Sequence, residues 1–228
     1  MFSPAGRSAM VGGRLARRVY EQLKQDLLAG RYPAGEPITV VDLREEYQVS
    51  KQPVMEALHM LAADRLVQIQ PQVGVRVSRY TLEEVEAFFW MFSRTEGGMA
   101  HRAALRRTDA QLAELAGLCD TLEALESRAA AGGTGQAGSG PAYVRGNRSI
   151  HTLIHRMADS PLAADISHDL WDLSDFLIAT HGGGFTGSLV ERNRGHREVY
   201  EGIRDRDPER AEQAMTQHIL DSPLASHP

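Results

Sequence analysis

Three neighbouring polar residues, Ser50, Lys51 and Gln52, stand where the sequence predicts the start of a helix. Serine is a preferred helix N-cap, and the following Pro53 is tolerated in a first helical turn. Such a terminus presents unpaired backbone N–H groups, to which these residues add a hydroxyl, an ammonium and an amide. These groups suit phosphates and base edges, so the pattern indicates contact with nucleic acid.

A second pattern of polar residues lies in the last third of the chain. Asn147 and His151 are four residues apart, which places them on one face of one predicted helix. His196 and His218 fall in two successive predicted helices, and an antiparallel arrangement of those helices brings the two positions level. The spacing therefore predicts that these side chains can approach one another inside a helical domain.

The elements around Ser50 form a short series of helices followed by a hairpin. The predicted elements are helices over about 14–29, 40–47 and 50–63, and strands over 66–70 and 75–79. Pro71 and Gly74 mark the turn between the two strands. Three helices and a β-hairpin in this length are the order of a winged helix-turn-helix, which we assign to residues 14–79, after a disordered tail over 1–13.

From Thr81 onward the periodicity predicts helices only. Thr81 and Glu84 have the spacing of a capping box, which starts a long helix. The predicted helices run from Thr81 through Ala103 and over about 108–131, 141–158, 161–180, 187–205 and 208–222. Glycine-rich breaks over 130–140 and 182–184 are predicted to be surface loops. The fold is thus mainly α, with an all-α antiparallel bundle of about six helices over 80–222 and a tail over 223–228.

Composition limits the classes of protein that fit. The 228 residues are 42% hydrophobic and 24% charged, which is a globular balance. A single cysteine, Cys119, excludes an internal disulfide framework, and we expect a reducing cytoplasm. No apolar run approaches the roughly 20 residues of a membrane span. The net charge is −5, yet residues 1–79 hold 11 Lys and Arg against 8 Asp and Glu, which permits a local phosphate-binding face.

Residues 14–79 resemble the winged helix of the GntR family of regulators. The stretch LLAGRYPAGEPITVVDLREEYQVSKQPVMEALHMLAADRLVQIQPQVGVRV keeps nearly all of the family's spacings. The resemblance implies binding of double-stranded DNA, with the wing turn reaching an adjacent minor groove. The candidate DNA-contacting residues are Arg44, Ser50, Lys51, Gln52, Gln72, Gly74 and Arg76.

This winged helix departs from the family at positions where arginine is common. Met55 and Val41 stand at two such positions, Lys51 replaces the usual arginine after the serine, and Arg65 replaces a glycine. Each missing guanidinium removes a bidentate base contact worth roughly 1–3 kcal/mol. We therefore expect an unusual operator sequence or affinity.

Residues from about Thr81 to Ser222 resemble the FCD ligand-binding domain of FadR-like GntR regulators. The resemblance is strongest in HREVYEGIRDRDPERAEQAMTQHI (196–219) and in NRSIHTLIHRMADSP (147–161). In many of these domains three histidines and an acidic or amide residue hold a divalent metal, here implied to be zinc or nickel. Carried over by position, the ligands are Asn147, His151, His196 and His218. A metal-free polar pocket made by the same side chains is the alternative.

The resemblance also implies a small carboxylate effector. Phe92 stands where the family has an arginine, so the carboxylate contact is expected from Arg94, Arg102 or the metal. His155 shares the face of His151 and is a further candidate for the effector pocket. Its other interpretation is a hydrogen-bonded core histidine, as for His181.

These observations predict a homodimeric repressor that binds a near-palindromic operator, with effector binding transmitted through a hinge at Ser78–Thr81. The alternative is a metal- or ligand-binding sensor whose winged helix contacts protein. No H-E-x-x-H or Ser-His-Asp pattern is present, so we expect no enzyme activity.

Overall fold

The computed structural model describes residues 4–131, 141–181, 189–221 and 224. The chain divides into two compact units. The N-terminal unit comprises the chain up to Tyr80 together with a segment that starts at Asp172, and the helical unit comprises Thr81–Trp171 together with the last part of the chain. Among the described residues, no helix is both long and apolar enough to cross a membrane.

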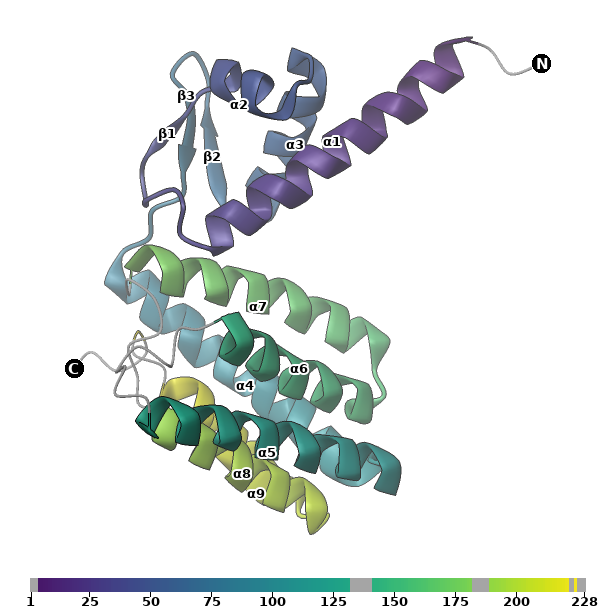
Figure 1. Ribbon diagram of the computed structural model, residues 1–228, viewed down its shortest axis with the longest axis vertical. Helices are drawn as coiled ribbons and strands as arrows, with labels where there is room; N and C mark the ends of the chain where they lie inside the picture. Colours follow the sequence, from purple (N-terminus) through teal and green to yellow (C-terminus); the bar gives the residue numbers. More distant parts are fainter. Residues whose placement is uncertain (1–3, 132–140, 182–188, 222–223, 225–228) are drawn as a thin grey trace. The chain divides into compact units, whose positions relative to one another are not determined.

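The N-terminal unit is a winged helix-turn-helix, as predicted (Figure 1). Its elements are α1 (Pro4–Leu28), β1 (Pro37–Ile38), α2 (Val40–Tyr47), α3 (Lys51–Ala63), β2 (Val67–Gln70) and β3 (Gly74–Val77). The three strands form an antiparallel sheet in the order β1-β3-β2. The core is built from the apolar faces of α1 and α3, where residues such as Val19, Leu23, Val54 and Leu58 are fully buried.

Three details of this unit differ from the prediction. Helix α1 begins at Pro4 rather than near Arg14, and a proline at the first helical position is favourable for a helix start. Strand β1 has only two residues and pairs with a distant strand, so no local periodicity marks it. Ser50 does occupy the N-cap of α3, but its side chain makes no capping hydrogen bond.

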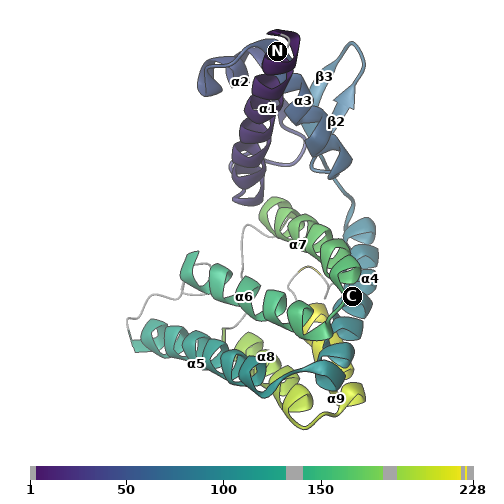
Figure 2. The ribbon, with the colours of Figure 1, turned by 90° about the vertical axis from the view of Figure 1, so that its right-hand side faces the viewer.

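The helical unit contains the six predicted helices. They are α4 (Leu82–Arg106), α5 (Asp109–Ala131), α6 (Pro141–Ala158), the first half of α7 (Pro161–His181), α8 (Leu189–Arg204) and α9 (Pro208–Leu220). The capping box of Thr81 and Glu84 is formed at the start of α4. Helix α4 packs against α6, α8 and α9, and α5 packs against α6 and α8 (Figure 2). The two expected glycine-rich loops lie almost wholly outside the described residues.

Two glycines set the distance between α8 and α9. A Cβ added to Gly202 would lie 2.7 Å from the backbone nitrogen of Ala211, and one added to Gly195 would lie 2.5 Å from Nδ1 of His218. Real Cβ atoms do not approach so closely, so both positions require glycine for this packing. The close approach brings His218 on α9 beside α8.

Candidate functional site

Three buried histidines from three different helices meet inside the helical unit. His151 lies on α6, His196 on α8 and His218 on α9, and each is at most 4% exposed. Ring centroids are 4.2 Å apart for His196 and His218, and 5.5–5.6 Å apart for His151 and each of the others. One nitrogen from each ring lies within 4.8 Å of the others, which is a span that one metal ion can bridge. We call these three residues the histidine cluster.

Four ring nitrogens of the histidine cluster are buried without a hydrogen-bond partner in the described part of the chain. The unpartnered buried atoms include Nε2 of His151, both ring nitrogens of His196 and Nε2 of His218. Oδ1 of Asn147, one helical turn before His151, is also buried without a partner. Leaving such groups unpaired costs about 1–3 kcal/mol each, so the cluster is expected to have a ligand. Three imidazoles and an amide oxygen fit a zinc or nickel ion.

Burial lowers the pKa of His196 and of His218 well below the usual imidazole range. Neighbouring positive charge acts in the same direction, from His151 and Arg192 on His196. Both rings are therefore neutral at physiological pH and keep a lone pair available to bind a cation.

A buried carboxylate, Glu96 on α4, orients the histidine beside it. Its Oε2 lies 2.9 Å from Nδ1 of His151, its Oε1 lies 2.8 Å from Nε2 of His155, and it also accepts a hydrogen bond from Ser167. Burial alone would raise the pKa of Glu96, but the hydrogen bonds from the two histidines outweigh it and hold the pKa below its ordinary value. The carboxylate thus holds His151 with Nε2 as the free ligand atom, as partners of metal-binding histidines do.

An aromatic wall covers the other side of His151. The ring of Trp171 lies 4.2 Å from the ring of His151, and Phe92 contacts Trp171 edge-on with ring centroids 5.3 Å apart. Phe92 is fully buried at the position where the family resemblance predicts an arginine. The side chain at this position is therefore apolar, and any cation near the histidine cluster must come from elsewhere.

The sequence analysis missed the cation that does lie near the histidine cluster, Arg192. It is 8% exposed, it lies one turn before His196 on α8, and its charge lowers the pKa of the clustered histidines. The four-residue spacing to His196 was the available signal. Of the predicted effector contacts, Arg94 is exposed above the ring of Trp90, and Arg102 is exposed with Nε donating to the carbonyl of Ala158.

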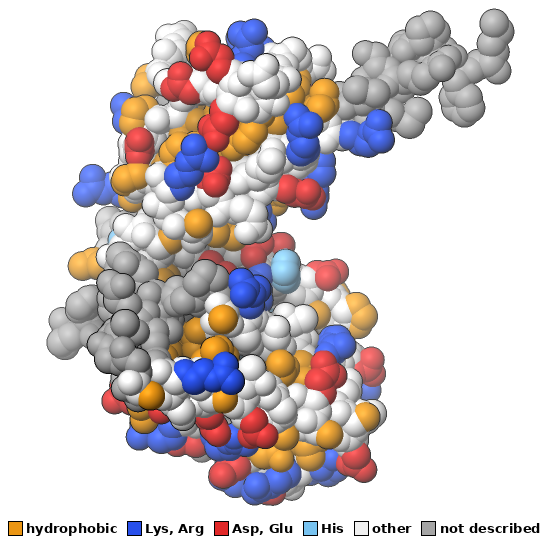
Figure 3. Space-filling view, in the orientation of Figure 1, with side chains coloured by type: hydrophobic (Ala, Val, Ile, Leu, Met, Phe, Trp, Pro, Cys, Tyr) orange, Lys and Arg blue, Asp and Glu red, His pale blue; other side chains and the backbone are white. Residues whose placement is uncertain are grey.

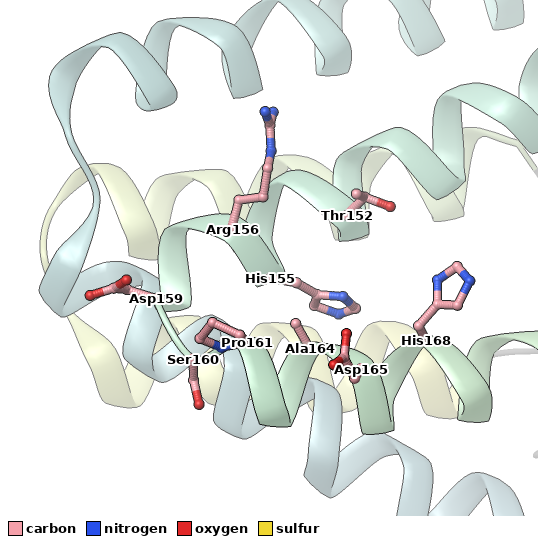
Figure 4. Close-up of a pocket in the computed structure, with 9 residues that line it drawn as sticks. All are labelled: Thr152, His155, Arg156, Asp159, Ser160, Pro161, Ala164, Asp165 and His168. Atoms are coloured by element: carbon pink, nitrogen blue, oxygen red, sulfur yellow. The ribbon is translucent and has the colours of Figure 1, made fainter. Parts of the chain in front are cut away.

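The third predicted effector contact, His155, does adjoin the histidine cluster through Glu96 and also lines a groove of about 340 Å³ (Figure 4). The groove lies between the end of α6 and the start of α7. Its lining residues are Thr152, His155, Arg156, Asp159, Ser160, Pro161, Ala164, Asp165 and His168. His155 therefore connects this groove to the carboxylate that holds His151.

Two of the predicted DNA-contacting residues, Arg44 and Ser50, line a hollow of about 350 Å³ next to the start of α3. Its lining includes Arg44 and Gln48 from the end of α2 and Ser50 at the N-cap of α3. Lys51 and Gln52 are exposed in the first turn of α3. The hollow thus offers a guanidinium, the amide of Gln48 and a helix N-terminus, which are groups that bind phosphates and bases, beside the carboxylate of Glu45.

The wing also exposes its predicted residues. Gln72 and Gly74 have φ values of 65° and 128° in the turn between β2 and β3, and Arg76 on β3 donates to the carbonyl of Gly35. Val41 is 58% exposed at the edge of the hollow, so an apolar group replaces the expected arginine there. On the visible face of the molecule, basic and acidic side chains are mixed (Figure 3).

An exposed recognition helix and wing, joined in one chain to a helical unit with an internal ligand-type site, define a transcription regulator. The chain belongs to the GntR family of bacterial regulators, in the group that carries an FCD domain. The profile described as "Bacterial regulatory proteins, gntR family" matches residues 15–77, and that of the FCD domain matches residues 93–221. Members of the family regulate transcription and are not enzymes.

Similar proteins of known name carry the same two parts. The HTH-type transcriptional repressor RspR of Escherichia coli (strain K12) is 26% identical over 207 residues, covering 89% of this chain and 85% of RspR. The repressor NanR of Cronobacter sakazakii is 27% identical over 226 residues, covering 94% and 86%. The structure of E. coli McbR/YncC has the same fold, with a TM-score of 0.72 and 18% identity over 90% of this chain and 93% of that one.

Proposed function

We propose that this protein is a homodimeric, cytoplasmic repressor that leaves its operator when a small carboxylate binds in the helical unit. The observation that carries the proposal is the histidine cluster, in which four buried ring nitrogens have no partner in the described chain although Glu96 orients the ring of His151. The large majority of buried polar groups in folded proteins have a partner, and a ligand in the cluster would supply one for these nitrogens. The ligand site is thus internal, in a unit separate from the DNA-contacting residues.

The proposed ligand site holds a divalent zinc or nickel ion. Its ligands would be His151, His196 and His218, with Asn147 adding an amide oxygen. When bound, such an ion supplies positive charge and open coordination positions for a carboxylate. The amide oxygen of Asn147 is neutral, so the site keeps more positive charge than a site with aspartate and favours an anionic effector.

The charge of Arg192 supports a carboxylate as the effector. This guanidinium is buried, and its charge lowers the pKa of the clustered rings, so it would also favour a negatively charged group bound in the cluster. Arg192 takes the role first expected of Arg94 and Arg102, which lie at the surface. His155 contributes from the side of the groove between α6 and α7.

On the DNA side, two copies of α3 enter successive major grooves of a near-palindromic operator, about 34–36 Å apart. The DNA contacts come from the start of α3 and from the wing. The contacting residues are those predicted from the sequence: Arg44, Ser50, Lys51, Gln52, Gln72, Gly74 and Arg76. Repression is supported by the names of RspR and NanR, both of which are called transcriptional repressors.

Metal analysis of purified protein tests the ligand site. We expect one zinc or nickel ion per chain, lost in His196→Ala and retained in the control His59→Ala, which removes an exposed histidine on α3. Metal content equal in both variants and the parent would contradict the metal site. A parent that holds no metal but still binds a carboxylate would favour the metal-free pocket.

A mobility-shift assay with the DNA upstream of the protein's own gene tests the regulator. Lys51→Ala should weaken binding and reduce the slope of log K against log salt by about 1, as expected for one lost phosphate contact. The control Arg194→Ala, an exposed arginine on α8, should leave the slope unchanged. Absence of any shift at low salt would instead favour a winged helix that contacts protein.

A further inference from the structure

Two large apolar side chains are exposed in the winged helix. Among residues 13–80, whose side chains the structure describes, Val41 is 58% exposed and Val73 is 69% exposed, whereas the other large apolar side chains are buried or half-buried. Val41 lies at the edge of the hollow beside α3, and Val73 lies in the wing turn between β2 and β3 (Figure 1). A single exposed apolar residue is ordinary, but both of these stand where DNA contacts are expected.

Val41 belongs to the face of α2 that lines the hollow. Val41, Arg44, Glu45 and Gln48 are three or four residues apart along α2 and line the hollow together with Ser50 at the N-cap of α3. The N-terminal residues of the second helix in a helix-turn-helix contact base edges in the major groove. Val41 therefore lies beside the groups that we expect to reach the bases.

The charges in the hollow balance each other. Arg44 supplies a cation and Glu45 an anion, and neither side chain forms a hydrogen bond or an ion pair within the described residues. The carboxylate of Glu45 would repel a phosphate. A hollow with no net charge and an apolar edge therefore suits the uncharged edges of base pairs better than it suits phosphate groups.

An apolar side chain has one distinctive partner on the edge of a base pair, which is the 5-methyl group of thymine. Thymine presents this methyl group in the major groove, where the other bases present hydrogen-bond donors and acceptors. Valine ends in two methyl groups, and its branched Cβ restricts χ1. Its apolar surface therefore has a nearly fixed direction and loses little side-chain freedom on contact.

We propose that Val41 recognises a thymine of the operator through the 5-methyl group in the major groove. The proposal rests on the DNA binding of the proposed function and adds to it a preference for one A·T base pair in each half-site. The contact removes apolar surface on both sides from water, which is favourable without any hydrogen bond.

Val73 provides a matched contrast on the same unit. It is the same residue type and is also exposed, but it lies on the wing, which we expect in the minor groove. The minor groove presents no thymine methyl group. Val73 therefore contributes no preference for thymine over uracil.

Operators that contain deoxyuridine test the proposal, because deoxyuridine differs from thymidine only in lacking the methyl group. The segment upstream of the protein's own gene that the protein protects from nuclease is synthesised with each symmetry-related pair of thymines replaced in turn. Fluorescence anisotropy gives the dissociation constants. For one pair of thymines, binding of the parent should weaken about tenfold, or about three- to fivefold per half-site, as expected for one methyl group returned to water.

The variant Val41→Ala assigns the effect to its residue. It should bind the thymine operator about tenfold more weakly than the parent, and the uracil replacement should cause no further loss. The control Val73→Ala should keep the full sensitivity of the parent to uracil. The slope of log K against log salt should be unchanged in Val41→Ala, since no phosphate contact is lost. Val41 is exposed, so its replacement leaves the core intact.

The outcomes separate this proposal from the DNA binding on which it rests. No binding of the parent at low salt would overturn both. Binding that no uracil replacement weakens would overturn the recognition of thymine alone. A replacement that weakens Val41→Ala as much as the parent would assign the thymine to another residue and overturn the role of Val41. A reduced salt slope in Val41→Ala would likewise overturn it, because Val41 would then support phosphate contacts instead.

Discussion

Two clusters of polar groups among the described residues, one around Lys24 and one formed by the buried histidines, differ in how completely their members are paired. In the N-terminal unit, Nζ of Lys24 lies 3.0 Å from Asp64, 2.8 Å from Asp172 and 2.8 Å from the hydroxyl of Tyr20. In the histidine cluster, by contrast, four ring nitrogens and the nearby amide oxygen of Asn147 have no partner within the described chain.

The difference separates a structural cluster from a ligand site. Around Lys24 the chain itself supplies every partner of the ammonium, and its bonds to the two carboxylates raise the pKa of Lys24 although burial alone would lower it. Around the histidines the chain supplies the orientation, through Glu96, but not the partner. The first cluster is complete when the protein folds, whereas the second lacks the partners that the proposed ligand would supply.

The largest expected effect is on the stability of the fold, when the cluster around Lys24 is broken. Lys24→Met leaves Asp64 and Asp172 without their cation and should lower the free energy of unfolding by about 2–3 kcal/mol, less than for a fully buried pair because Asp64 is a third exposed. Lys24 is charged between pH 6 and 9 both in the unfolded chain, where its pKa is near 10.5, and in the folded protein, where its pKa is raised. The loss in the free energy of unfolding should therefore be constant over this pH range.

Urea unfolding of the parent and the variant at several pH values measures this loss. The matched control is Arg17→Met, which breaks the exposed pair with Glu21 and should change stability by less than about 0.5 kcal/mol. Equal effects of the two substitutions would show that the Lys24 cluster is no more than a surface ion pair.

The next largest expected effect is on metal affinity, when His151 loses the carboxylate that orients it. Glu96→Gln removes the charge that holds His151 and should weaken metal binding about 10–100-fold, as outer partners of metal ligands do. Competition with a chelator of known affinity measures the change. Full metal affinity in this variant would mean that Glu96 serves the fold and not the site.

A charged oxygen at position 147 should have a smaller effect on metal affinity, and it should increase the affinity. Asn147→Asp replaces a neutral oxygen by a charged one and should tighten metal binding, by about tenfold if the oxygen is a direct ligand. The same competition assay measures it, with Asn193→Asp as a control at a buried asparagine that hydrogen-bonds to Glu126 instead. Unchanged affinity would place Asn147 outside the coordination shell.

The smallest effect should be on the stability of the metal-free protein when a histidine of the cluster is removed. His218→Leu replaces an unpaired buried ring by an apolar side chain, so the free energy of unfolding should change by less than about 1 kcal/mol. Urea unfolding in the presence of a chelator tests this. A loss as large as that of Lys24→Met would indicate that His218 is already paired in the metal-free protein.

The sequence predicted the helices well, because periodicity and caps are local signals. The three predicted histidines do lie together, and their role as metal ligands stays a prediction. Thr81 and Glu84 marked the start of α4, and the spacing of Asn147 and His151 placed both on one face of α6. It did not predict β1, whose partner strand is distant in the chain. Nor did it identify Arg192 as the buried cation, because burial depends on how α8 packs and not on its own sequence.

The two glycines between α8 and α9 have a consequence for how this regulator can change in evolution. Any side chain at Gly195 would displace His218, since its Cβ would lie 2.5 Å from the ring, while leaving the winged helix untouched. Under the proposed function, such a protein would still occupy its operator but would no longer respond to the proposed effector. Selection for permanently silenced target genes would therefore act on this glycine, and not on the residues that read DNA.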